Sequence, residues 1–131
     1  MTRPTKDQYY LEIAKVVASR STCLRRQYGA VIVSADDRII ATGYNGAARG
    51  EPNCCDVGKC QREELNVPHG ERYELCVAIH AEDNALTQAG RAANGAKLYL
   101  AGFENGKQIQ ACPCLMCSRK IKNSGIIEVI T

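Results

Sequence analysis

The chain has 131 residues, of which 45% are hydrophobic and 24% are charged. These proportions are close to those of folded globular proteins, and they exclude disordered, collagen-like and fibrous classes. A net charge of +3 without a concentrated basic face argues against nucleic-acid binding and is compatible with a small anionic ligand. The length fits one domain over residues 1–131. No membrane-length apolar run or leader is present, so we expect a cytoplasmic protein without a membrane partner.

The first third of the chain predicts a helix followed by a β-hairpin. Thr5 and Gln8 have the spacing of a capping box, and apolar residues then recur at helical intervals, which predicts a helix over residues 6–20. Residues 30–33 form a short apolar run that ends in a polar turn, and residues 39–44 resume it. This pattern is typical of two antiparallel strands joined by a turn.

The second half alternates predicted helices and strands. We expect helices over residues 79–88 and 114–122, strands over 97–101 and 126–130, and a small hairpin around Asn105 and Gly106 in the polar excursion 102–111. Alternation of this kind favours a mainly parallel sheet covered by helices.

Residues 45–75 carry glycines, prolines and cysteines but little periodic apolar pattern. A loop this long is unusual in a compact domain unless something pins it. The chain has eight cysteines, and without a secretion signal these are interpreted as thiols or metal ligands before disulfides. The sequence therefore predicts a Cys-rich, metal-binding insertion at about residues 45–76.

Two short motifs predict a catalytic zinc site. His80 is followed at the second position by Glu82, and Pro113 precedes the pair Cys114 and Cys117. One histidine and two cysteines give zinc three protein ligands and leave the fourth position open for water, as a hydrolytic zinc requires. Both motifs open predicted helices, where unpaired amides and the helix dipole favour thiolates. The combination is the signature of zinc-dependent nucleobase deaminases.

Glu82 has the offset expected of a proton carrier. It would take a proton from the water, deliver it to a ring nitrogen of the base, and later protonate the departing amine. The alternative is a buried core histidine, with Cys114 and Cys117 as a structural zinc knuckle or as buried thiols. Such a knuckle has no use for a free carboxylate at this offset. Cys112 is interpreted as a bystander, because a fourth thiolate would close the site to water.

The sequence resembles the cytidine and deoxycytidylate deaminase superfamily, and most closely its deoxycytidylate (dCMP) branch. The stretches that carry the resemblance are residues 20–23, 29–32, 42–46, 76–85 and 113–117. The resemblance implies a three-layer α/β/α sandwich with a mixed five-stranded sheet. It also implies conversion of dCMP to dUMP, a homo-oligomer (a hexamer, or an assembly based on dimers or trimers), and dCTP and dTTP as effectors.

Several substrate contacts are implied by the same resemblance. Asn45 is expected in the active site against the sugar or base. A phosphate needs cationic or amide partners, and Ser21, Arg25 and Arg26 lie where the resemblance places the phosphate side of the pocket. The two arginines are the stronger candidates, and a solvated turn is the alternative.

A second, structural zinc is expected to fix the 45–76 insertion, as it does in several dCMP deaminases. The candidate ligands are Cys23, Cys55, Cys60 and Cys76, with Cys54 and His69 as substitutes. Isolated free cysteines are the alternative, because no Cys-x-x-Cys pair anchors this set.

Two other functions stay open at this point. One is deamination of another cytosine nucleoside or nucleotide, or of a purine base, including an adenosine in tRNA. The RNA version predicts a basic face with stacking aromatics, which seven aromatic residues without tryptophan do not favour. The other is a non-catalytic zinc-binding scaffold that senses nucleotides.

Overall fold

The sheet at the centre of the molecule is mixed rather than mainly parallel. The computed structural model describes residues 2–131. Its strands follow the order β2 (Ile39–Tyr44), β1 (Arg26–Val33) and β5 (Lys97–Glu104). The far edge of β5 is shared, because β6 (Lys107–Ile109) pairs with residues 102–104 and β7 (Glu128–Ile130) pairs with residues 97–99.

The pairing directions correct one sequence prediction and confirm another. Only β5 and β7 run parallel, whereas β1/β2, β1/β5 and β5/β6 are antiparallel. The mainly parallel sheet was therefore a wrong prediction, and the five-stranded mixed sheet is confirmed. The reason is that β1 inserts between β2 and β5. Those two strands are parallel to each other, as a helical crossover requires, but they are not neighbours.

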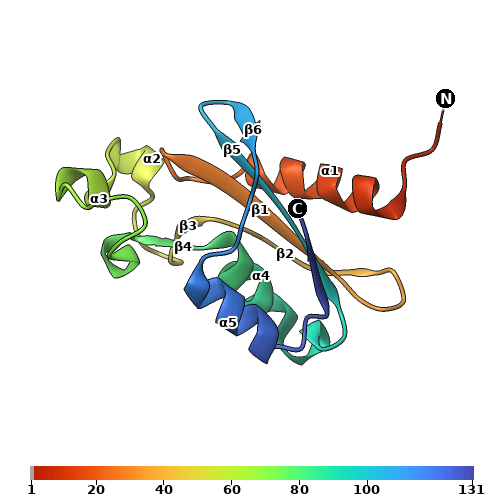
Figure 1. Ribbon diagram of the computed structural model, residues 1–131. Helices are drawn as coiled ribbons and strands as arrows, with labels where there is room; N and C mark the ends of the chain where they lie inside the picture. Colours follow the sequence, from red (N-terminus) through yellow and green to blue (C-terminus); the bar gives the residue numbers. More distant parts are fainter. Residues whose placement is uncertain (1) are drawn as a thin grey trace.

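Helices cover both faces of this sheet, which gives the predicted three layers (Figure 1). Helix α1 (Lys6–Ala18) lies on one face and is capped by Thr5 and Gln8 as predicted. Its side chains pack with Val31 and Tyr99 of the sheet. Helices α4 (Ala81–Ala89) and α5 (Leu115–Asn123) lie on the other face. The core on that side includes alanines of α4 and leucines of β5.

Two glycines allow the helices to approach the strands closely. A Cβ at Gly29 of β1 would lie 2.1 Å from the Ala14 carbonyl oxygen of α1. A Cβ at Gly43 of β2 would lie 2.4 Å from the Ala81 carbonyl oxygen of α4. Since neither distance can accommodate a methyl group, these glycines set how closely α1 and α4 pack.

The segment 45–76 is not a plain loop. It contains the short strand β3 (Gly46–Ala47), the one-turn helices α2 (Cys54–Val57) and α3 (Gln61–Glu64), and the 3-10 turn η1 (Tyr73–Leu75). Strand β3 pairs with β4 (Ala78–Ile79), directly before His80. This two-stranded ribbon places the start of the segment beside the start of α4.

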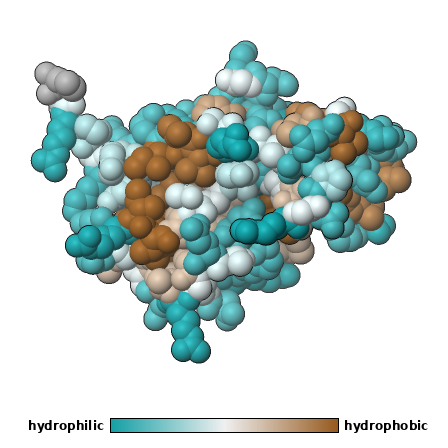
Figure 2. All heavy atoms as spheres, turned by 180° about the vertical axis from the view of Figure 1, so that it is seen from behind, coloured by the Kyte–Doolittle hydropathy of each residue, from teal (hydrophilic) through white to brown (hydrophobic). Residues whose placement is uncertain are grey.

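The surface also carries apolar side chains. Figure 2 shows brown apolar side chains gathered on the face opposite to that of Figure 1. Exposed large apolar residues include Val16, Leu115 and Ile127, each more than two-thirds accessible. Among residues 2–131, none of the helices combines the length and apolarity needed to cross a lipid bilayer.

Candidate active site

His80, Cys114 and Cys117 meet where two helices begin. His80 is the N-cap of α4 and Cys114 is the N-cap of α5, so both motifs open helices as predicted. The Nδ1 atom of His80 lies 3.4 Å from the Cys117 sulfur and 3.6 Å from the Cys114 sulfur. Residues 2–131 contain no other group of three or more such side chains whose ligand atoms lie within 4.8 Å of one another.

The chemistry of these three donors fits zinc. One imidazole nitrogen and two sulfurs form a donor set that zinc prefers, and three protein ligands leave one position open. Burial, together with the neighbouring Glu82 and Cys114, raises the pKa of the Cys117 thiol. A buried thiol of this kind needs a cation to be held as thiolate, because burial disfavours the charged form.

Glu82 lies in the first turn of α4, two residues after His80, and its side chain is 5% exposed. Burial raises the pKa of its carboxyl group above the usual range for glutamate. A raised pKa makes a carboxylate a stronger proton acceptor than an ordinary glutamate. The geometry therefore puts a buried carboxyl group beside the three donors, where it could carry a proton.

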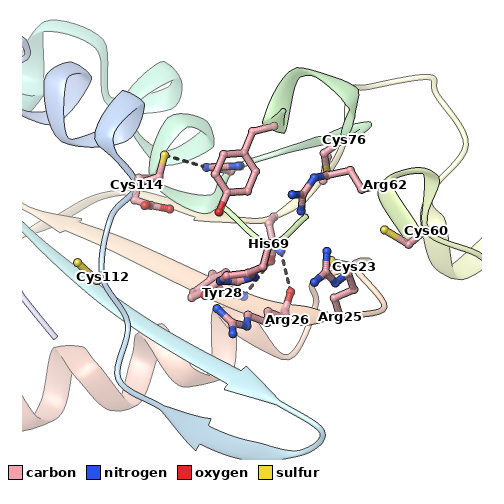
Figure 3. Close-up of a pocket in the computed structure, with 15 residues that line it drawn as sticks. Cys23, Arg25, Arg26, Tyr28, Cys60, Arg62, His69, Cys76, Cys112 and Cys114 are labelled. Carbon is pink, nitrogen blue, oxygen red and sulfur yellow. Dashed lines mark hydrogen bonds between the residues drawn. The ribbon is translucent and has the colours of Figure 1, made fainter. Parts of the chain in front are cut away.

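A cavity of about 290 Å³ opens onto this group. His80, Glu82 and Cys114 line one part of it, whereas Arg62 and Tyr73 of the 45–76 segment line another. Figure 3 shows Cys114 and Arg62 on different sides of the space that the stick side chains surround. The volume is at the lower end of what small-ligand pockets occupy.

Asn45 lines the cavity and is held by its neighbours. Its Oδ1 atom accepts from the Ser21 hydroxyl at 2.6 Å and from the Tyr28 amide at 2.8 Å, and its Nδ2 donates to the Arg26 carbonyl at 2.8 Å. One Nδ2 hydrogen remains for a ligand. Ser21 also donates to the Asn45 carbonyl and is not among the cavity-lining residues, so its contact is with Asn45.

The predicted arginines line the cavity but have protein partners. Arg25 forms an ion pair with Glu63 at 3.1 Å, and Arg26 forms one with Glu104 at 3.0 Å. Both lie in the wall of the cavity. Sequence reasoning missed Arg62, which is buried in the same wall. Its position two residues after Cys60 was visible in the sequence, but its burial was not.

The cysteines predicted to bind a second zinc do not form a group as close as that of His80, Cys114 and Cys117. Cys54 and Cys60 are buried, Cys23 and Cys76 are half-buried, and Cys55 is exposed. The Cys55 thiol points to Asp56. Burial raises the pKa of Cys54, and Cys23, Cys60 and Cys76 add to that rise, so these thiols are near neighbours. Of the adjacent pair, Cys54 is the buried residue and Cys55 the exposed one.

The fold and the donor set define a class of protein before any comparison is made. It is an α/β/α protein in which a histidine and a Cys-x-x-Cys pair, placed at two helix starts, form a donor set suited to zinc beside a buried glutamate. The particular family follows from sequence. Residues 4–131 match the family described as the cytidine and deoxycytidylate deaminase zinc-binding region, and the chain belongs to that family.

Individual relatives agree with this assignment. Deoxycytidylate deaminase of Schizosaccharomyces pombe is 43% identical over 130 residues, which are 98% of this chain but 37% of the relative. Deoxycytidylate deaminase of Mycobacterium phage D29 is 40% identical over 136 residues, 99% of this chain and 96% of the phage protein. The crystal structure of dCMP deaminase from the cyanophage S-TIM5 in complex with dCMP and dUMP is 25% identical. It superposes with a TM-score of 0.68, covering 98% of this chain and 82% of that one.

Proposed function

We propose that this protein hydrolyses dCMP to dUMP and ammonia in a zinc-dependent reaction. The observation that carries the proposal is the cavity itself, which is lined on one side by Glu82 and two of the three candidate zinc donors, His80 and Cys114, and on another by arginines. Relatives named deoxycytidylate deaminase, and a similar structure holding dCMP and dUMP, support the same substrate.

His80, Cys114 and Cys117 are the proposed ligands of the catalytic zinc. When bound, zinc supplies the Lewis acidity that makes a water nucleophilic near neutral pH. Glu82 takes a proton from the attacking water and transfers it to the cytosine ring nitrogen. The same carboxylate then takes the second proton of that water, from the hydroxyl group now bonded to the ring carbon, and gives it to the amine. The bond between the ring carbon and the amine nitrogen breaks, the carbonyl forms, and ammonia leaves. Atoms balance, because one water is added for each ammonia released.

The substrate's other end needs different partners. We propose that the free Nδ2 hydrogen of Asn45 contacts the sugar or base, and that Ser21 holds Asn45 in place. The cationic wall that contains Arg25 and Arg26 would attract the phosphate. A nucleoside lacks that phosphate, so a preference for dCMP over deoxycytidine is expected.

A second zinc, assembly and regulation extend the proposal. We propose that Cys23, Cys60 and Cys76 bind a structural zinc and that Cys54 replaces Cys55 as the fourth ligand, since Cys54 is buried and Cys55 is exposed. Zinc would draw these thiols together and fix the 45–76 segment. Exposed apolar side chains such as Leu115 are compatible with a homo-oligomer. Effector control by dCTP and dTTP remains part of the proposal.

The experiment is an ammonia-release assay on the zinc-loaded protein. Its substrates are dCMP, CMP, deoxycytidine, cytidine, adenosine and guanine, each with and without dCTP. The key variant is Glu82→Gln, which keeps the size of the side chain but cannot carry the proton. Turnover of dCMP should fall by at least about 100-fold while bound zinc is unchanged. Glu12→Gln, on the exposed side of α1, is the matched control.

Either of two results would contradict the proposal. If the wild-type protein binds zinc but turns over nothing in the panel, the scaffold interpretation is preferred. If Glu82→Gln retains full activity, Glu82 is not the proton carrier.

A further inference from the structure

Arg62 is a buried charge without a counter-ion. Its residue is 5% exposed, and no carboxylate in residues 2–131 forms an ion pair with it. Its Nε atom is buried and has no hydrogen-bond partner. An unpaired buried charge is costly, because the protein interior replaces water poorly. A protein keeps such a group when something outside the chain completes it.

The rest of the guanidinium is held firmly. Its Nη2 donates to the Pro68 carbonyl at 3.0 Å and to the Glu71 carbonyl at 2.7 Å. The guanidinium carbon also lies over the Tyr73 ring, 4.7 Å from its centre. These contacts are with neutral groups, so they orient the charge without neutralising it. The guanidinium is thus fixed before any ligand arrives, which lowers the entropy lost on binding.

The other two arginines of the cavity differ in this respect. Arg25 and Arg26 are each about one-third exposed, and each already has a carboxylate partner, Glu63 and Glu104 respectively. To bind a phosphate, either arginine would have to share or release its carboxylate. Arg62 would not.

The place of Arg62 matches the far end of a nucleotide. The Tyr73 ring that supports the guanidinium also lies edge-on to the His80 ring, with centres 5.5 Å apart. One tyrosine ring therefore contacts both the Arg62 guanidinium and the His80 ring, so a ligand that reaches His80 can also reach the arginine. In Figure 3 the Arg62 side chain reaches from its own segment toward the middle of the cavity, opposite Cys114.

We propose that Arg62 binds the 5′-phosphate of the nucleotide substrate and so sets the preference for nucleotide over nucleoside. This inference rests on the proposed function. The phosphate supplies the missing negative charge, and its oxygens accept the hydrogen on Nε. An arginine presents a planar set of donors that suits phosphate geometry, and pairs of this type are stronger than neutral hydrogen bonds.

A different partner for Arg62 is the cysteine group. Cys76 lies close enough for the charge of Arg62 to act on its thiol. If thiolates on a second zinc balanced Arg62, its removal would release that zinc and weaken deamination of every substrate equally. The two readings therefore differ in metal content and in substrate ratio.

The test compares Arg62→Gln, Arg25→Gln and Arg26→Gln with the wild-type protein. Each is assayed for kcat/KM on dCMP and on deoxycytidine, and for bound zinc. Arg62→Gln should lower kcat/KM for dCMP by about 10- to 100-fold, mainly through KM, while deoxycytidine changes far less. The amount of bound zinc should stay the same. Arg25→Gln and Arg26→Gln should change the ratio of kcat/KM for dCMP to kcat/KM for deoxycytidine less than Arg62→Gln does.

Arg62→Lys keeps the positive charge but loses the planar set of donors. Its kcat/KM for dCMP should therefore lie between the values for the wild type and for Arg62→Gln. It carries the test should Arg62→Gln fail to fold. An equal loss on both substrates, a loss of zinc, or a larger change in ratio for Arg25→Gln or Arg26→Gln would overturn the inference. Absence of dCMP turnover in the wild type would instead refute the proposed function, so the two failures are distinguishable.

Discussion

Replacing Asn45 by alanine tests whether the active-site wall is held by its buried polar network. Asn45 is 6% exposed, and its side chain contacts three neighbours. In Asn45→Ala, the Tyr28 amide and the Arg26 carbonyl lose their partner. The Ser21 hydroxyl does not, since it also donates to the main-chain carbonyl of residue 45 at 2.9 Å.

The expected loss of stability follows from the number of hydrogen-bonding groups left without a partner. Two backbone groups are left unsatisfied, and each costs about 1–3 kcal/mol when buried. Both groups belong to half-buried residues, where water partly replaces the lost bond. We therefore expect the free energy of unfolding to fall by about 2–4 kcal/mol. The missing Nδ2 donor should also lower kcat/KM for dCMP by about tenfold, the value of one neutral hydrogen bond.

Urea denaturation of the zinc-loaded protein, followed by circular dichroism, gives the free energy of unfolding. Asn84→Ala is the matched control, because the Asn84 side chain makes one exposed hydrogen bond, to the Tyr44 carbonyl. It should cost about 1 kcal/mol or less. If Asn45→Ala is no more destabilising than Asn84→Ala, the buried network does not hold the wall and the reasoning is refuted.

Three further predictions concern packing and metal. Gly29→Ala places a methyl group 2.1 Å from the Ala14 carbonyl oxygen. This overpacking should lower the free energy of unfolding by at least about 1–3 kcal/mol. An unchanged urea midpoint would contradict the close contact of α1 with the sheet. Cys54→Ser should remove the second zinc while Cys55→Ser retains it, as measured by elemental analysis, and the reverse outcome would restore Cys55 as the ligand. Removal of all zinc with a chelator should abolish dCMP turnover and zinc should restore it, whereas activity in the metal-free protein would refute a metal-dependent reaction.

The local features of the fold were readable from the sequence because each depends on a few adjacent residues. The capping box at Thr5 and Gln8, the hairpin of β1 and β2, and the hairpin of β5 and β6 all formed as predicted. The relative directions of the strands in the sheet could not be predicted in this way. They depend on β1 lying between β2 and β5, and the alternation of helices and strands contains no information about that insertion.

The same division applies to the site. His80, Cys114 and Cys117 were found from spacing alone, because each motif occupies a single helix start and the helix fixes where its ligands point. Arg62 was not found. Its burial depends on the carbonyls of residues 68 and 71 and on the Tyr73 ring, which close around it only when the whole segment has folded.

This difference bears on how substrate preference and chemistry are separated in the molecule. The zinc donors and Glu82 belong to α4 and α5, whose alanine and isoleucine side chains are buried against the sheet. Arg62 and Tyr73 belong instead to a segment of one-turn helices with few buried apolar side chains. Such a segment gains little stability from burial, so it depends on hydrogen bonds such as those of Arg62 to the carbonyls of residues 68 and 71. If the proposed roles are correct, a substitution in this segment should change the preference for nucleotide over nucleoside while the spacing of His80, Cys114 and Cys117 is kept.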